Sequence, residues 1–306
     1  MLIKSLRSRE GWFSNFSFRL ILLFALVAGI SSCTKDELIE NTIPGNVPPP
    51  DQTIEDVTIN NYINRVYVSV LARKPTDAEK DSAFTVLRKT NVSGTARKQF
   101  LDSVFNNKEY LPHLYDFARA DLLQNLDTTF ITQYLIIFNN ALTDTAQKLF
   151  WDVYQYEIYR LDTLQRVPQD LKNHTIDIVQ LHKRCVNNYF YDQINMGTEN
   201  FVVSCFQHFL NRYPTTNELT QAENIVNGSP GALFLQSGLN KNDFLNIFFS
   251  SLNYYEGLAT NLYSKFLARK PNSIEMGNAT EKFKLNQDYV QMQKDILITN
   301  EYIGIK

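Results

Sequence analysis

Apolar residues between positions 59 and 71 recur at the spacing of a helix with one buried face. They fall at positions i, i+4, i+7, i+8, i+11 and i+12, which is the period expected of an amphipathic α-helix. No stretch of alternating apolar and polar residues bounded by hairpin turns occurs in the chain. The pattern therefore predicts an all-α fold. The residues of this first stripe are Ile59, Ile63, Val66, Tyr67, Val70 and Leu71.

Three segments of the chain align with one another without gaps. They read "YVSVLARKPTDAE" (67–79), "FQHFLNRYPTTNE" (206–218) and "YSKFLARKPNSIE" (263–275). Each has an aromatic residue, a leucine four positions later, and then an arginine, a proline, a capping residue and a glutamate. Such self-similarity indicates a repeated structural unit.

The shared positions have a structural explanation. The proline ends one helix, and the next residue can cap a second helix with the glutamate three positions later, as in a capping box. The arginine lies in the last turn of the first helix, where a cation is favoured. We therefore expect helix, proline corner and helix in each unit. The corner residues are Arg73, Pro75, Thr76 and Glu79; Arg212, Pro214, Thr215 and Glu218; and Arg269, Pro271, Asn272 and Glu275.

Each unit closes with a further similar helix. These segments read "FLDSVFNNKEYL" (100–111), "FLNIFFSSLNYY" (244–255) and "MQKDILITNEYI" (292–303), and their tyrosines Tyr110, Tyr254 and Tyr302 align. Between the first and second units we expect more helices, which form a degenerate unit followed by an insertion. The predicted segments are 114–123, 129–139, 145–161, 171–191 and 198–212.

The N-terminus has the features of a secretory signal peptide. Basic residues up to Arg19 precede an uninterrupted apolar run over 20–30, which is too short to span a bilayer as a helix. The following "ISSC" resembles the lipobox of bacterial lipoproteins. This resemblance implies cleavage before Cys33, a lipid on its thiol and stable anchoring by several acyl chains. The alternative is an ordinary secreted protein with a chance cysteine.

The segment after the cysteine bears on location. Lys35, Asp36 and Glu37 in "CTKDE" resemble the export signal of Bacteroidota surface lipoproteins, which implies the cell surface of the outer membrane; the alternative is its periplasmic face. Prolines in 38–52 predict an extended tether. The expected organisation is 1–32 signal peptide, 33–53 lipidated cysteine and tether, 54–125 repeat region 1, 126–197 insertion or degenerate repeat, and 198–306 repeat regions 2 and 3.

The corner pattern resembles uncharacterised helical repeats with an "LYxxLLxRxP" signature in secreted and surface proteins of bacteria. These repeats are distantly similar to the phycobilisome linker domain, a scaffolding module. The resemblance implies an interaction role and no active site. Glycine commonly precedes the arginine in that family, whereas this chain has Ala72, Asn211 and Ala268. The matching residues are Tyr67, Leu71, Arg73 and Pro75, and Tyr263, Leu267, Arg269 and Pro271; the middle unit has Phe206 in place of tyrosine.

Composition narrows the function classes. The 306 residues are 44% hydrophobic and 20% charged with a formal charge of −2, which excludes a disordered chain and a polytopic membrane protein. The same charge argues against a nucleic-acid partner. No common catalytic or cofactor motif occurs, so we expect neither enzyme activity nor a cofactor. A hydrolase is the less favoured alternative. It would need Asp152, Glu157 and Asp162, which helical spacing does not bring to one face.

The histidines give no metal signature. His174 and His182 would lie about 12 Å apart along one helix, too far to share an ion without further ligands, so we expect no metal site. His113 lies near Asp116, as a structural hydrogen bond or an acid–base pair. His208 takes the place of Ser69 and Lys265 in the repeats, a solvent-type position, and we expect no functional role for it.

The two remaining cysteines leave two readings open. Cys185 and Cys205 could be bridged in an exported protein. Buried free thiols are favoured, because Cys205 takes the apolar position of Val66 and Leu262 in the repeats.

Two patterns concern sugars. The rings of Tyr189 and Tyr255 could face a glycan, although the recurrence of Tyr254 favours packing. Five Asp-Ser/Thr-apolar triplets resemble the O-glycosylation acceptor of exported Bacteroidota proteins, which implies glycans on Ser82, Ser103, Thr128, Thr145 and Thr163.

The leading interpretation combines anchor and repeats. It is a surface-exposed outer-membrane lipoprotein that acts as a non-catalytic scaffold or binding subunit, with another outer-membrane or surface protein as partner. The alternative is a lipoprotein that captures a glycan or nutrient.

Overall fold

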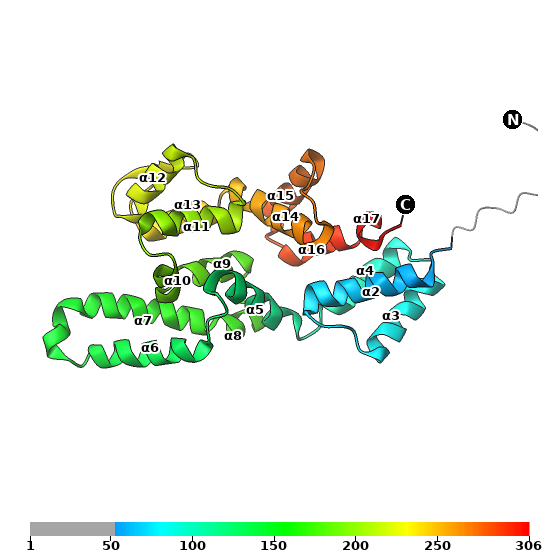
Figure 1. Cartoon of the computed structure of the whole chain (residues 1–306), viewed down its shortest axis with the longest axis horizontal. Coiled ribbons are helices and arrows are strands. Elements are labelled where there is room, and N and C mark those ends of the chain that lie inside the picture. The colour runs from blue at the N-terminus through cyan, green and yellow to red at the C-terminus, as the bar shows by residue number, and fades with distance from the viewer. Residues whose placement is uncertain (1–52, 306) are drawn as a thin grey trace, which may run out of the picture. The chain divides into compact units, whose positions relative to one another are not determined.

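Residues 53–305 are described by the computed structural model, and within them sixteen α-helices are joined by loops, one 3-10 turn and one short β-hairpin (Figure 1). The predicted all-α fold is confirmed. We call this part the helical body; it belongs to one compact unit. None of its helices is long and apolar enough to cross a membrane. The predictions for the signal peptide, Cys33, Lys35, Asp36, Glu37 and most of the tether lie outside the described residues.

The helices follow one another with short connections. The first corner joins α2 (Asp56–Leu71) to α3 (Asp77–Lys89), and α4 (Gly94–Phe105) and α5 (Tyr110–Leu123) follow. Next come α6 (Thr128–Ala141), the 3-10 turn η1 (Thr145–Phe150), α7 (Trp151–Gln165), α8 (Val167–Lys172), α9 (Ile178–Val186) and α10 (Tyr189–Ile194). The second corner joins α11 (Thr198–Leu210) to α12 (Thr216–Val226), and β1 (Gly231–Leu233), β2 (Gln236–Gly238) and α13 (Lys241–Phe249) follow. The third joins α14 (Leu252–Leu267) to α15 (Ser273–Asn286), before α16 (Tyr289–Leu297) and α17 (Asn300–Ile303).

All three corners have the same local geometry. The first helix ends on a residue in the left-handed conformation, with φ of 54°, 55° and 54° at Ala72, Asn211 and Ala268. Glycine adopts this conformation without steric cost, whereas alanine and asparagine do not. The capping box expected after each proline is present in all three corners.

The corner arginine explains the spacing of the motif. Its guanidinium forms a two-pronged pair with the capping-box glutamate, at 2.8 Å in Arg73–Glu79 and 2.7 Å in Arg212–Glu218. It also lies over the ring of the aromatic residue six positions earlier, as Arg73 does over Tyr67. The motif is therefore held by a stacked cation that also secures the next helix. The third corner repeats these contacts with Arg269, Glu275 and Tyr263.

The first and third corners add a second carboxylate. Glu109 accepts from Arg73 at 2.6 Å, and Glu301 accepts from Arg269 at 2.6 Å. Asn253 stands at the aligned position for the middle corner. Among the residues that the structure describes, Arg212 pairs with Glu218 and with no further carboxylate.

The beginning and the end of the helical body pack together. Arg65 on α2 donates to the backbone oxygen of Tyr302 at 2.6 Å, and Lys294 on α16 pairs with Asp102 on α4 at 2.7 Å. Tyr62 and Tyr302 meet edge to face in the core. Figure 1 accordingly shows the C-terminus beside α2 and α4.

The prediction of one helix over 171–191 is wrong. Three short helices replace it because two polar side chains cap new helix starts inside the range. Asp177 accepts from the amide of Gln180, and the buried Asn188 accepts from the amide of Tyr191. The strands β1 and β2 were also missed, because three residues each are too few to show alternation.

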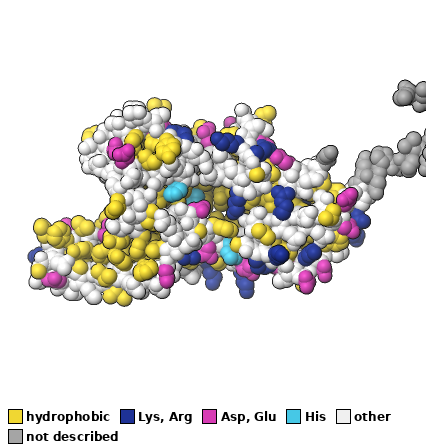
Figure 2. Space-filling model, in the orientation of Figure 1, with side chains coloured by type: hydrophobic (Ala, Val, Ile, Leu, Met, Phe, Trp, Pro, Cys, Tyr) yellow, Lys and Arg dark blue, Asp and Glu magenta, His cyan; other side chains and the backbone are white. Residues whose placement is uncertain are grey.

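Helices α6 and α7 form a hairpin that packs mainly on itself. Within α6 only Ile131 is fully buried. Large apolar side chains of both helices and of their connection face solvent, and Figure 2 shows apolar side chains gathered over this hairpin. We call this set the hairpin surface; it consists of Phe130, Ile136, Ile137, Leu149, Phe150, Val153, Tyr156 and Tyr159.

Candidate functional site

A cavity of about 430 Å³ lies where six helices of the body meet. Its walls come from α2, α5, α9, α11, α14 and α16, so the helices that lead into all three corners contribute. We call it the central cavity. Its volume is in the range of sites that hold small molecules.

Three residues of the cavity wall occupy the same place in the three corners. Ser69, His208 and Lys265 each lie two positions after the corner's aromatic residue, and all three line the central cavity. Serine, histidine and lysine at this position predict an ordinary solvent-facing residue. His208 and Lys265 are indeed exposed, and the space that their side chains border is the cavity.

The tyrosines that close the units support the wall from behind. The hydroxyl of Tyr110 accepts from Gln293 at 2.6 Å, and that of Tyr302 lies 3.3 Å from the Ser69 hydroxyl. The Tyr254 hydroxyl lies 2.8 Å from Nδ1 of His182. All three rings are buried, as the packing interpretation of Tyr254 expects. Each aligned tyrosine thus holds one side chain of the cavity wall.

One acidic and one basic group line the cavity without an ion-pair partner. The Lys265 ammonium lies 4.2 Å from the centre of the Phe117 ring. Within residues 53–305, no salt bridge of 4.0 Å or less involves either Lys265 or Asp121. The surrounding protein desolvates Lys265 and lowers its pKa, while the charge of Asp121 acts in the opposite direction. The two groups are therefore close enough to influence each other without forming a pair.

The two cavity histidines are weak bases. Burial lowers the pKa of His182 to about 3, so its imidazole is neutral at physiological pH. Desolvation also lowers the pKa of His208, and the nearby Asp121 partly opposes this shift. Nδ1 of His208 lies 3.3 Å from the Tyr191 hydroxyl. The imidazoles thus offer hydrogen bonds to the cavity and little charge.

Gly257 sets the distance between two walls. A Cβ at this position would lie 1.7 Å from the backbone oxygen of Phe209, so only glycine allows α14 to pass so close to α11. A glycine inside the predicted apolar pattern of a helix was the available sequence signal, and it was missed. The other missed wall residues, Asp121, Asn261, Tyr289 and Gln293, carry no motif.

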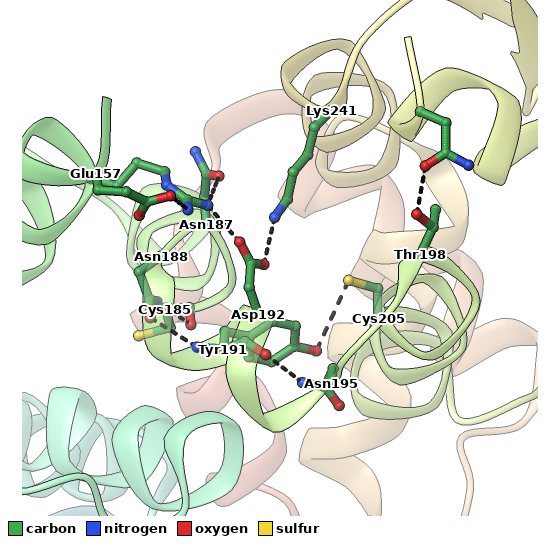
Figure 3. Close-up of polar contacts among 12 residues, drawn as sticks. Glu157, Cys185, Asn187, Asn188, Tyr191, Asp192, Asn195, Thr198, Cys205 and Lys241 are labelled. Carbon is green, nitrogen blue, oxygen red and sulfur yellow. Dashed lines mark hydrogen bonds and ion pairs between the residues drawn. The ribbon is translucent and has the colours of Figure 1, made fainter. Parts of the chain in front are cut away.

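A second polar cluster lies at the base of the hairpin (Figure 3). Asp192 on α10 accepts from Arg160 on α7 at 2.8 Å and from Lys241 on α13 at 2.5 Å. Arg160 also pairs with Glu157. Arg160 is buried, and it needs these carboxylates to offset its desolvation. The cluster ties the hairpin to the rest of the body.

The two cysteines near this cluster are free and buried, which confirms the favoured reading. Cys205 Sγ lies 4.0 Å from the Tyr191 hydroxyl, on a different helix from Cys185 (Figure 3). Burial raises the pKa of both thiols to about 12, so neither is a reactive nucleophile.

The remaining predicted polar residues do not assemble into a site. His113 Nδ1 lies 3.9 Å from Asp116, and His174 is exposed. Glu157 and Asp162 pair with separate arginines, apart from Asp152. The part of the chain that the structure describes holds no cluster of three or more metal-ligating side chains.

The two tyrosines considered as glycan platforms are packing residues. Tyr189 packs against Tyr134 with the two rings tilted by 35°, and it is half-buried. Tyr255 is 9% exposed and packs against Phe283, as the favoured packing interpretation expects, and it does not present its ring as the glycan alternative requires. Of the predicted glycosylation residues, Ser82, Ser103, Thr128 and Thr145 are exposed, whereas Thr163 is half-buried and donates to the backbone of Arg160.

No protein-family model, curated protein or solved structure matches the chain.

Proposed function

We propose that the chain is a lipid-anchored outer-membrane protein whose helical body binds another envelope protein through the hairpin surface. In this proposal the role is non-catalytic, and Cys33 is the lipid attachment point. The observation that carries it is the clustering of exposed large apolar side chains on α6, η1 and α7. Leu149 is 87% exposed, Tyr159 62% and Ile136 55%.

The size of the hairpin surface supports a specific contact. An aromatic side chain has about 150–250 Å² of surface and an aliphatic one somewhat less, and roughly half of it is accessible in each member of the set. The total is on the order of 800 Å², which is what one partner contributes to an interface of standard size. Apolar patches of this extent on soluble domains usually mark interaction sites.

The charges of the hairpin favour a different protein over a second copy. Asp127, Asp144 and Asp152 are exposed around the apolar side chains, against two exposed basic residues, Lys148 and Arg166, of which Arg166 already pairs with Asp162. Two copies meeting on this face would bring these carboxylates together. The partner that fits is a protein with an apolar face surrounded by lysine and arginine.

The segment after the lipid anchor would set how far the helical body can lie from the membrane. From Cys33 to Gln52 the chain has a length of roughly 65 Å when extended, at about 3.3 Å per residue. Such a tether allows the body to meet a partner in the same membrane. Labelling with palmitate in the native host tests the anchor: wild type should take up label, Cys33→Ala should not, and equal labelling would exclude Cys33. Removal of the body by protease on intact cells tests surface exposure.

Site-specific photo-cross-linking in the native host tests the contact. A photoreactive residue at Ile137 or Tyr156 should give one discrete product, whereas the exposed controls Ile274 and Leu285 on α15 should not give it. Ile136→Glu should abolish the product while thermal unfolding stays unchanged. The same product from the control positions, or a product with twice the mass of this chain, would contradict the proposal.

A further inference from the structure

The central cavity carries opposite charges that do not neutralise each other. Asp121 lies one helical turn after Phe117 on α5, and Lys265 lies one turn after Asn261 on α14. Helical residues four apart share a face, so each charge belongs to the cavity-lining face of its helix. The two helices contribute to the same cavity, and no salt bridge joins the two groups.

Both groups are exposed, so solvent can hydrate them, and a molecule that fills the cavity removes part of that hydration. Among the described residues, Lys265 is accompanied by the rings of Phe117 and Phe266 and by no carboxylate within ion-pair distance. A molecule that displaces this solvent would have to bring a negative group to Lys265 and a positive group to Asp121 to compensate both.

Gln293 adds a hydrogen-bond acceptor to the same wall. It is 3% exposed, and its Nε2 donates to the Tyr110 hydroxyl and to the backbone oxygen of Tyr289. These bonds fix the amide, and its Oε1 has no hydrogen-bond partner within residues 53–305. Because Gln293 lines the cavity and Oε1 is not among the fully buried unpaired atoms of the described residues, this oxygen is accessible there to a ligand or a water molecule that donates to it.

The rest of the wall is apolar. Leu114, Phe117, Phe209 and Leu258 line the cavity between the polar groups. An aliphatic or aromatic substituent of a ligand would be desolvated against these side chains.

From this arrangement we infer that the central cavity is a binding site for a small zwitterion, an amino acid or dipeptide with an apolar side chain. The ligand's carboxylate pairs with Lys265, and its ammonium group pairs with Asp121 and donates to Oε1 of Gln293. A simple anion would leave Asp121 unpaired and would be repelled by its carboxylate. A simple cation would leave Lys265 unpaired and would be repelled by its ammonium group. A sugar would leave both charges without a counter-charge. This inference does not depend on the hairpin surface.

Calorimetric titration of the full mature lipoprotein in detergent tests the inference. The probes are L-leucine, L-phenylalanine, leucyl-glycine and phenylalanyl-glycine, each also in its N-acetylated and its C-amidated form. At least one zwitterion should bind, and removal of either charge should weaken its binding about tenfold or more. Absence of binding at millimolar concentrations, or equal binding of the blocked forms, would overturn the inference.

Two variants assign the charges to the two ends of the ligand. Lys265→Met should weaken binding of the zwitterion about tenfold and make the affinity insensitive to amidation of the carboxylate. Asp121→Asn should make it insensitive to acetylation of the amine. Lys80→Met and Asp81→Asn, outside the cavity, are matched controls that should bind as wild type does. Unchanged sensitivity in Lys265→Met and Asp121→Asn, with unfolding curves like that of wild type, would contradict the assignment.

Discussion

The two outer corners are built around Arg73 and Arg269, and the middle corner is built around Arg212. The corners differ in how many carboxylates the arginine pairs with. Each outer arginine holds two carboxylates, one from its capping box and one from the start of a following helix. The middle arginine holds only its capping-box glutamate among the described residues. The second carboxylate connects the corner to a helix beyond it, so the outer corners also link helices that are distant along the chain.

The residue before the arginine also differs, and here the middle corner has the less strained backbone. Alanine takes the left-handed conformation in the outer corners, whereas asparagine takes it in the middle one. Asparagine tolerates this conformation better than alanine. The corners with more ion pairs therefore also carry more backbone strain. Substitution of the arginine or of the residue before it separates the two effects.

The largest effect is expected from removal of an outer arginine. Arg73→Met or Arg269→Met should lower the free energy of unfolding by about 1 to 2 kcal/mol, and Arg212→Met by less than about 1 kcal/mol. The outer variants lose two partners and leave two carboxylates facing each other. Urea unfolding measures the difference. Arg88→Met, which removes one exposed pair with Asp56, is the control. Equal losses in all three corners would show that the second carboxylate contributes nothing.

The same variants should differ in their response to acid. The arginine, through its hydrogen bonds, lowers the pKa of Glu79 and of Glu218 to about 2. A folded-state pKa below the ordinary value of 4.5 stabilises the fold above about pH 5, and this contribution is lost as the pH falls towards about 2. Arg73 also lowers the pKa of Glu109, so Arg73→Met should remove more of the acid dependence than Arg212→Met. Urea unfolding at several pH values gives these slopes, and parallel slopes would contradict the prediction.

Glycine at the left-handed position should relieve the strain of the outer corners. Ala72→Gly and Ala268→Gly should each raise the free energy of unfolding by about 0.5 to 1 kcal/mol, whereas Asn211→Gly should change it by a few tenths at most. Thermal unfolding provides the measurement. A matched gain at Asn211 would mean that all three positions are equally strained.

The smallest effect is expected from completing the middle corner. Asn253→Glu places a carboxylate where Glu109 and Glu301 stand in the aligned units, and it should stabilise the protein by about 0.5 kcal/mol or less. A double-mutant cycle with Arg212→Met separates pairing from the general benefit of an acidic residue near the start of α14. If the gain persists without Arg212, the substitution acts through the helix end alone.

The sequence predicts the corners well because their interactions are local. The proline, the cap and the glutamate all lie within seven positions of the arginine, so a short motif determines the geometry around Arg73. The break at Asn188 was harder to foresee, because its side chain caps a helix inside an otherwise continuous helical pattern.

The central cavity could not be predicted in the same way. Asp121 and Lys265 are 144 positions apart in the sequence, and they line the same cavity only because six helices pack around it. The polar character of Ser69, His208 and Lys265 indicates access to solvent, but not whether that solvent lies outside the protein or in a cavity. The cavity depends on how the helices are arranged in space, which these residue types do not indicate.

The equivalence of Ser69, His208 and Lys265 has a consequence for how this architecture can change. The arginine, proline and glutamate that hold each corner are separate from the one side chain that the corner offers to the cavity. A mutation at that single position alters the chemistry of the interior without weakening the joint that supports it. Substitutions at these three positions can therefore change the lining of the central cavity one side chain at a time. Selection for a stable fold acts on the other residues of the corners.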